Sequence, residues 1–126
     1  MNHLAIYAAP AGRILIAAIF VLSGINKITS YEMTAQYMSA MGVPSIMLPM
    51  VIAFEIAAGL SVIAGWQTRI AAFLLAVFCI ISGMIFHGDT ADQMQFIMLM
   101  KNFAMAGGFL FLVANGAGVF SLDNRQ

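Results

Sequence analysis

The chain has 126 residues, of which 63% are apolar and only 8% are charged. An average soluble domain carries about 25% charged residues, and a chain this short could not hide so much apolar surface in an aqueous core. Its five basic and five acidic residues cancel and form no cluster, so nucleic-acid binding is not expected. The composition therefore predicts one domain, residues 1–126, embedded in a lipid bilayer.

Cys79 is the sole cysteine and lies inside an apolar stretch. The chain can form neither an internal disulfide nor a dithiol redox pair, so a redox role would need another electron carrier. The segment around His87, Asp89 and Asp92 contains a weak H-x-D-x-x-D pattern. Its spacing is not one that metal sites favour, and no metal site is predicted.

Four apolar stretches follow one another along the chain, each near the about 20 residues that cross a hydrocarbon layer as a helix. The first contains Arg13 ahead of an apolar run and could be mistaken for a secretory signal, but Asn26 and Lys27 continue the segment, so we expect a retained helix. The spans are predicted at residues 11–28, 45–64, 68–86 and 91–114.

Between the first two spans, residues 30–41 are less apolar and carry apolar side chains at helical spacing on one side. Thr29 and Glu32 form a T-x-x-E pattern that predicts a capping box, and Gly42 can supply the left-handed residue that ends a helix. We expect a short helix in the membrane interface. The sequence thus predicts an all-α, integral membrane four-helix bundle, up-down-up-down, followed by a short polar tail over residues 121–126.

Basic residues predict the orientation of the bundle. Arg13, Arg69 and Arg125 fall on one side of the predicted spans, and Lys27 lies towards the other. Positively charged side chains favour the cytoplasmic side of a membrane. Both termini are therefore predicted to be cytoplasmic.

Two charged residues lie deep inside predicted spans. An ionised carboxylate such as Glu55 costs about 2.5 kcal/mol or more at the centre of a spanning helix, and Lys101 carries a similar penalty. Both spans start from the same side, and each residue lies about eight to ten positions in, which at 1.5 Å per residue gives similar depths. We predict that Glu55 and Lys101 face each other.

Further polar residues are predicted to join this pair in a cavity open to the periplasmic side. Candidate catalytic residues are Glu55, Lys101 and His87, and candidate substrate-binding residues are Asn26, Lys27 and Asn102. Ionisable groups inside a membrane are functional by default. The alternative is that Glu55 and Lys101 form a structural ion pair that fixes helix register and binds nothing.

The order of short motifs along residues 12–123 resembles that of the DoxX family of small bacterial membrane proteins. The matching stretches are Gly12-Arg13-Ile14-Leu15, Ser23-Gly24-Ile25-Asn26-Lys27, Gly42-Val43-Pro44, Glu55 with Gly59, Thr68-Arg69, Phe86-His87, Met100-Lys101-Asn102, Gly107-Gly108 and Phe120-Ser121-Leu122-Asp123. The resemblance implies a four-helix bundle in the bacterial inner membrane. It also implies a loose association with redox chemistry, because the family is named for a subunit of a thiosulfate:quinone oxidoreductase and some relatives are linked to oxidative-stress systems.

The leading hypothesis is a redox-associated membrane subunit that holds a quinone or a similar small molecule in the polar pocket. Whether it is itself an enzyme stays open at this level, and a membrane or redox protein partner or a homo-oligomer fits equally. A second hypothesis is a non-catalytic assembly or chaperone subunit that docks another membrane protein. A small transporter ranks last, because four spans give little room for alternating access and no paired broken helices are seen.

Overall fold

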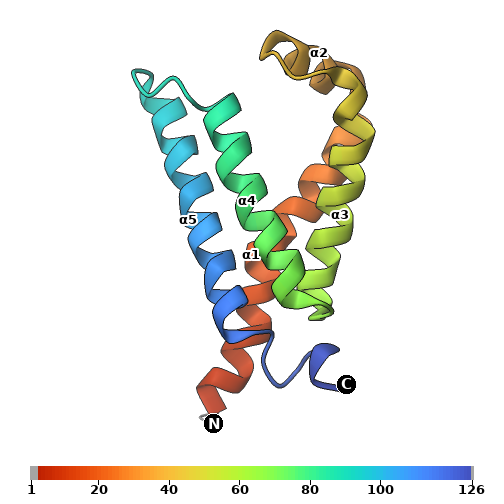
Figure 1. Cartoon of the computed structure of the whole chain (residues 1–126), viewed down its shortest axis with the longest axis vertical. Coiled ribbons are helices and arrows are strands. Elements are labelled where there is room, and N and C mark those ends of the chain that lie inside the picture. Colours follow the sequence, from red (N-terminus) through yellow and green to blue (C-terminus); the bar gives the residue numbers. More distant parts are fainter. Residues whose placement is uncertain (1–2, 126) are drawn as a thin grey trace.

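A computed structural model of the chain describes residues 3–125, and its regular elements are all helical. Four segments are long and apolar enough to cross a membrane: His3–Thr29, Ser45–Ala64, Thr68–Phe86 and Gln93–Asn115. The elements, shown in Figure 1, are α1 (His3–Thr29), α2 (Tyr31–Ala40), η1 (Ser45–Met47), α3 (Leu48–Ala64), α4 (Thr68–Phe86), α5 (Gln93–Asn115) and η2 (Asp123–Arg125). The predicted all-α four-helix membrane bundle is confirmed.

The boundaries of the predicted spans shift at both ends of the chain. α1 begins at His3 rather than at residue 11 and continues through Pro10, which removes a single backbone donor from a segment otherwise rich in helix formers. α5 begins at Gln93 rather than at residue 91, because the Asp92 carboxylate accepts a hydrogen bond from the backbone N–H of Met94 at 2.9 Å. This side-chain cap satisfies one of the free donors of the first turn.

The helix between the first two spans is confirmed, but its predicted capping box is wrong. Ser30 is the N-cap residue of α2 and makes no side-chain cap bond, while the Thr29 hydroxyl donates to the carbonyl of Asn26 at 2.9 Å. Gly42 adopts a φ of 82° and ends the helical segment as predicted. α2 lies at the end of the bundle opposite the chain termini (Figure 1).

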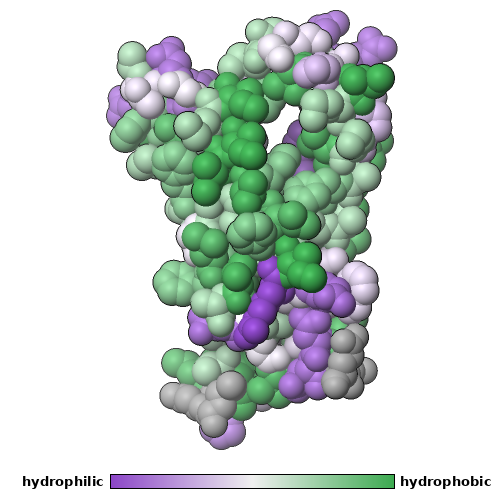
Figure 2. Space-filling view, viewed as in Figure 1, coloured by the Kyte–Doolittle hydropathy of each residue, from purple (hydrophilic) through white to green (hydrophobic). Residues whose placement is uncertain are grey.

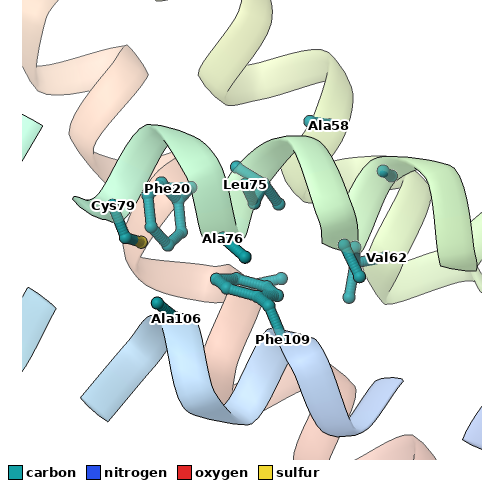
Figure 3. Packing of buried hydrophobic residues seen from close by; sticks show 11 residues of the cluster. Phe20, Ala58, Val62, Leu75, Ala76, Cys79, Ala106 and Phe109 are labelled. Carbon is teal, nitrogen blue, oxygen red and sulfur yellow. The ribbon is translucent and has the colours of Figure 1, made fainter. Parts of the chain in front are cut away.

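The four spans form two close pairs, α1 with α3 and α4 with α5, whereas α3 and α4 contact each other less. Small residues let α1 approach α3: a Cβ added to Gly59 would lie 2.8 Å from Cγ2 of Val21. The two pairs meet around a core that includes Phe20 and Phe109, whose rings pack edge-on at 5.5 Å (Figure 3). From this core the pairs diverge towards the end that carries α2 (Figure 1).

Arg13 binds the C-terminal end of α3. It is only 2% exposed, and its guanidinium donates to the carbonyl oxygens of Val62 at 3.2 Å and Ile63 at 2.9 Å, and also to that of Phe120. The last carbonyls of a helix have no partner within the helix, and a buried cation satisfies them while complementing the helix dipole. One side chain of α1 thus holds both α3 and the segment after α5.

Asp123 binds the N-terminal end of α4. Its carboxylate accepts from the backbone N–H groups of Gln67 at 2.7 Å and Thr68 at 2.9 Å, at the start of α4. Burial raises the pKa of Asp123, but hydrogen bonds from Thr68 and Gln67 and the positive charge of Arg13 outweigh it and place the pKa below its ordinary value of 3.8. The segment predicted only as a polar tail is therefore docked on the bundle over its described part, up to residue 125.

We expect Asp123→Asn to loosen this docking at neutral pH. Because the folded pKa is depressed, the carboxylate stabilises docking above the unfolded pKa, and that contribution is lost as pH falls through the folded value. Hydrogen exchange read by mass spectrometry should show faster exchange of the amides of Gln67, Thr68 and Asp123 in the variant. Glu32→Gln, a matched carboxylate removal on α2, should leave these amides protected; equal protection in Asp123→Asn would contradict the docking role.

Candidate functional site

An ion pair links α1 to α3 within the predicted membrane layer. Nζ of Lys27, in the last turn of α1, lies 2.7 Å from Oε1 of Glu55, in the middle of α3. The same Nζ donates to the hydroxyl of Ser23 at 2.7 Å, one turn earlier on α1. Glu55 is buried, and the Lys27 side chain is 25% exposed. Pairing offsets part of the cost of placing each charge among apolar helices.

The predicted pairing of Glu55 with Lys101 is wrong. Lys101 is exposed, because α5 packs mainly on α4 and presents the neighbouring Asn102 to it. Consecutive residues on a helix point about 100° apart, so Lys101 turns away from the interior. Similar depth along two helices does not fix which way each side chain points, and Lys27 occupies the position opposite Glu55.

A second polar group lies on the α4–α5 pair. The amide nitrogen of Asn102 donates to the carbonyl oxygen of Cys79 at 3.0 Å and lies 3.4 Å from the hydroxyl of Ser82. Gly83 makes this approach possible, since a Cβ there would lie 3.0 Å from Asn102. Asn102 therefore joins α5 to the backbone of α4 while keeping part of its surface accessible.

Of the predicted residues His87 and Asn26, the first lines the cavity and the second does not. Nδ1 of His87, at the end of α4, lies 2.7 Å from Oε1 of Gln95 on α5, so an amide orients the imidazole across the connection between the two helices. Asn26 is exposed and does not line the cavity described below. His87 is thus placed at the candidate site, and Asn26 is not.

A cavity of about 830 Å³ lies between the two helix pairs. Figure 2 shows the surface hollowed between the two helix pairs, with apolar residues around the opening. Its lining is mainly aliphatic and aromatic, and at the end near α2 the ring of Tyr37 stacks on that of Phe86 at 5.4 Å. The polar and charged lining residues include Ser23, Lys27, Thr34, Glu55, Ser82, His87 and Asn102.

The structure therefore brings four of the six predicted residues to one cavity and leaves Lys101 and Asn26 outside its lining. Ser23 and Ser82 were missed. Ser23 could have been found, because it lies four residues before Lys27 and so shares its helix face. Ser82 carries no such signal, since a serine in a spanning helix ordinarily serves close packing.

We expect Glu55→Ala to lower the stability of the purified protein in detergent. The change leaves Lys27 without its counter-charge, which costs about 1–2 kcal/mol after allowance for the partial exposure of the lysine. The double variant Lys27→Met with Glu55→Leu should recover most of this loss, because neither charge then remains. Thermal unfolding measures the stability of the single and the double variant, and Lys101→Met serves as the control. A larger loss of stability in Lys101→Met than in Glu55→Ala would contradict the pairing.

The sequence model of the DoxX family matches residues 8–88. Inner membrane protein YqjF of Escherichia coli (strain K12) is 43% identical over 111 residues, covering 88% of this chain and 85% of that protein. Inner membrane protein YphA of the same organism is 34% identical over 121 residues, covering 90% and 86%.

A third relative, named "Putative oxidoreductase CatD", comes from Bacillus subtilis (strain 168) and is 34% identical over 65 residues, which cover 52% of this chain and 48% of that protein. No solved structure matches the chain. The chain has four apolar spans, and the family model matches residues 8–88. Two relatives named as inner membrane proteins align with it over most of their length. The chain is an inner-membrane protein and belongs to the DoxX family.

Proposed function

We propose that this protein is a redox-associated membrane subunit that holds the head of a quinone, or of a closely similar lipid-soluble molecule, against the Lys27–Glu55 pair. The observation that carries the proposal is a charged pair on the wall of an otherwise apolar cavity, with the lysine partly exposed to it. The pair joins α1 to α3, and its partly exposed ammonium is also available to a ligand in the cavity.

The size and lining of the cavity suit such a ligand. Small-molecule sites are mostly clefts of roughly 300–1,000 Å³ that are apolar apart from a few polar groups, which orient the ligand. The cavity is about 830 Å³ and fits this description. The ring of a quinone would pack among side chains such as Phe54 and Phe78, while its carbonyl oxygen accepts from Lys27.

An apolar face of α4 offers a path for the tail of the ligand. Leu74, Val77 and Ile81 line the cavity, and 47%, 38% and 53% of their surfaces are accessible. In a bilayer these side chains would meet acyl chains. An isoprenoid tail lying along them would leave the cavity sideways, without crossing a polar layer.

The site also holds groups that exchange protons. Reduction of a quinone consumes two electrons and two protons, and Glu55 and His87 line the same cavity at different positions along the helices. With Nδ1 of His87 engaged by Gln95, Nε2 remains to face the cavity or the aqueous end. In this proposal the electrons come from a redox protein partner, in keeping with the name of the Bacillus relative.

Binding of a quinone to the purified protein tests this function. Decylubiquinone should raise the unfolding temperature of the parent protein in mild detergent and bind at about one molecule per chain. Lys27→Met should abolish the shift, because the donor to the quinone carbonyl is lost, whereas Lys101→Met should keep it. An unchanged unfolding temperature and no bound quinone in the parent protein would contradict the proposal.

We propose further that both chain termini are cytoplasmic and that the end carrying α2 faces the periplasm. The proposal is supported by the start of α1 and η2, which lie at one end of the bundle (Figure 1). Arg13 contacts Phe120 in the C-terminal segment, and Arg69 lies close to Asp123. Positively charged residues favour the cytoplasmic side. The site would then open between the helix pairs towards the periplasmic half of the membrane.

Cysteine labelling in intact cells tests this orientation. In a Cys79→Ala background, Gln36→Cys on α2 should react with a membrane-impermeant maleimide, and Asn115→Cys at the end of α5 should react only after the membrane is opened. Both positions are exposed. The reverse pattern would overturn the orientation without affecting the fold.

A further inference from the structure

The cavity carries two polar groups of different chemistry on its two walls. The Lys27–Glu55 pair belongs to the α1–α3 wall, and Asn102 with Ser82 belongs to the α4–α5 wall. Residues of both helix pairs line one cavity, so a ligand that fills it can contact both walls. The donors and acceptors on each wall that have no partner within the protein determine which head group the cavity can bind.

The α1–α3 wall offers a donor. A lysine ammonium has three N–H donors, and that of Lys27 uses two of them, one on Oε1 of Glu55 and one on Oγ of Ser23. No third acceptor contacts it within the described residues 3–125. The pair as a whole is neutral, so this wall favours an uncharged hydrogen-bond acceptor over an anionic head group.

The α4–α5 wall offers an acceptor. The carbonyl of Cys79 can only accept, so the amide of Asn102 must turn its nitrogen towards it and its oxygen Oδ1 away. Within the described part of the chain Oδ1 receives no hydrogen bond, and it is not sealed from solvent. Since Asn102 lines the cavity, this oxygen is available to a ligand that brings a donor.

From this arrangement we infer that the site selects the reduced quinol over the oxidised quinone, an inference that rests on the proposed function. A quinol carries hydroxyl groups, so one of its oxygens can accept from Lys27 while its other hydroxyl donates to Oδ1 of Asn102. A quinone carries acceptors only and would leave Oδ1 unpaired in an apolar cavity. An unpaired buried acceptor weakens binding, and we expect a loss of about tenfold in affinity, which corresponds to about 1.4 kcal/mol.

Titration calorimetry under argon tests the inference with four probes of one ring and tail: decylubiquinone, its quinol, and the monomethyl and dimethyl ethers of that quinol. The quinol and a monomethyl ether that keeps one hydroxyl should bind the parent protein about tenfold more tightly than the quinone. The dimethyl ether has the reduced ring but no donor, so it should bind no better than the quinone. Equal affinities across the four probes would overturn the inference.

Two variants locate the selectivity. Asn102→Leu should abolish the preference. The quinol then loses the acceptor for its hydroxyl, and the quinone no longer leaves an unpaired Oδ1 in the cavity. Ser82→Ala removes a neighbouring hydroxyl but keeps the bond from Asn102 to Cys79, so it should preserve the preference. If Asn102→Leu fails to fold, the comparison of the four probes on the parent protein still decides.

The outcomes separate this inference from the function on which it rests. Binding of the quinone and quinol with equal affinity, both lost in Lys27→Met, would uphold the proposed function and overturn the selectivity. A loss of both ligands to the same extent in folded Asn102→Leu would do the same. Binding of none of the four probes would overturn the proposed function itself.

Discussion

The ion pair between Lys27 and Glu55 is the constraint on which the arrangement of this bundle depends. Each charge would be costly alone among apolar helices, and their N–O distance of 2.7 Å fixes the rotation of α1 against α3. Close packing at Gly59 allows the two backbones to approach. Since α4 is tied to α5 instead, through Asn102, the molecule is two helix pairs that meet at a shared core and part above it (Figures 1 and 3).

Hydropathy predicted most of the fold because a bilayer leaves few alternatives. Four apolar stretches of sufficient length must become helices, and Gly42 marks an end that requires a positive φ. The burial of Glu55 could be predicted, because a charged side chain in the middle of a spanning helix is expected to face the interior of the bundle. The partner of Glu55 did not follow, because depth gives the height of a side chain and not its direction, and the packing of α5 against α4 turns Lys101 outward.

The docked C-terminal segment shows the same limit of prediction. Composition indicated a polar tail, and nothing in its spacing predicted that Asp123 would cap α4 or that Arg13 would cap α3. These contacts join residues that are 55 and 50 positions apart in the sequence, and local spacing cannot reveal such pairs. Together they close one end of the bundle with fixed charges, while the end that carries α2 has the cavity and its mainly apolar lining.

The composition of the chain makes one measurement especially direct, because it contains only two lysines, Lys27 and Lys101, and two glutamates, Glu32 and Glu55. Protein labelled with ¹⁵N at the lysine Nζ and ¹³C at the glutamate Cδ can be studied by solid-state NMR in lipid bilayers. Because Lys27 pairs with Glu55, we expect one short-range nitrogen–carbon coupling, which Lys27→Met removes and Lys101→Met leaves intact. Absence of the coupling in the parent protein, or its loss in Lys101→Met, would contradict the pairing.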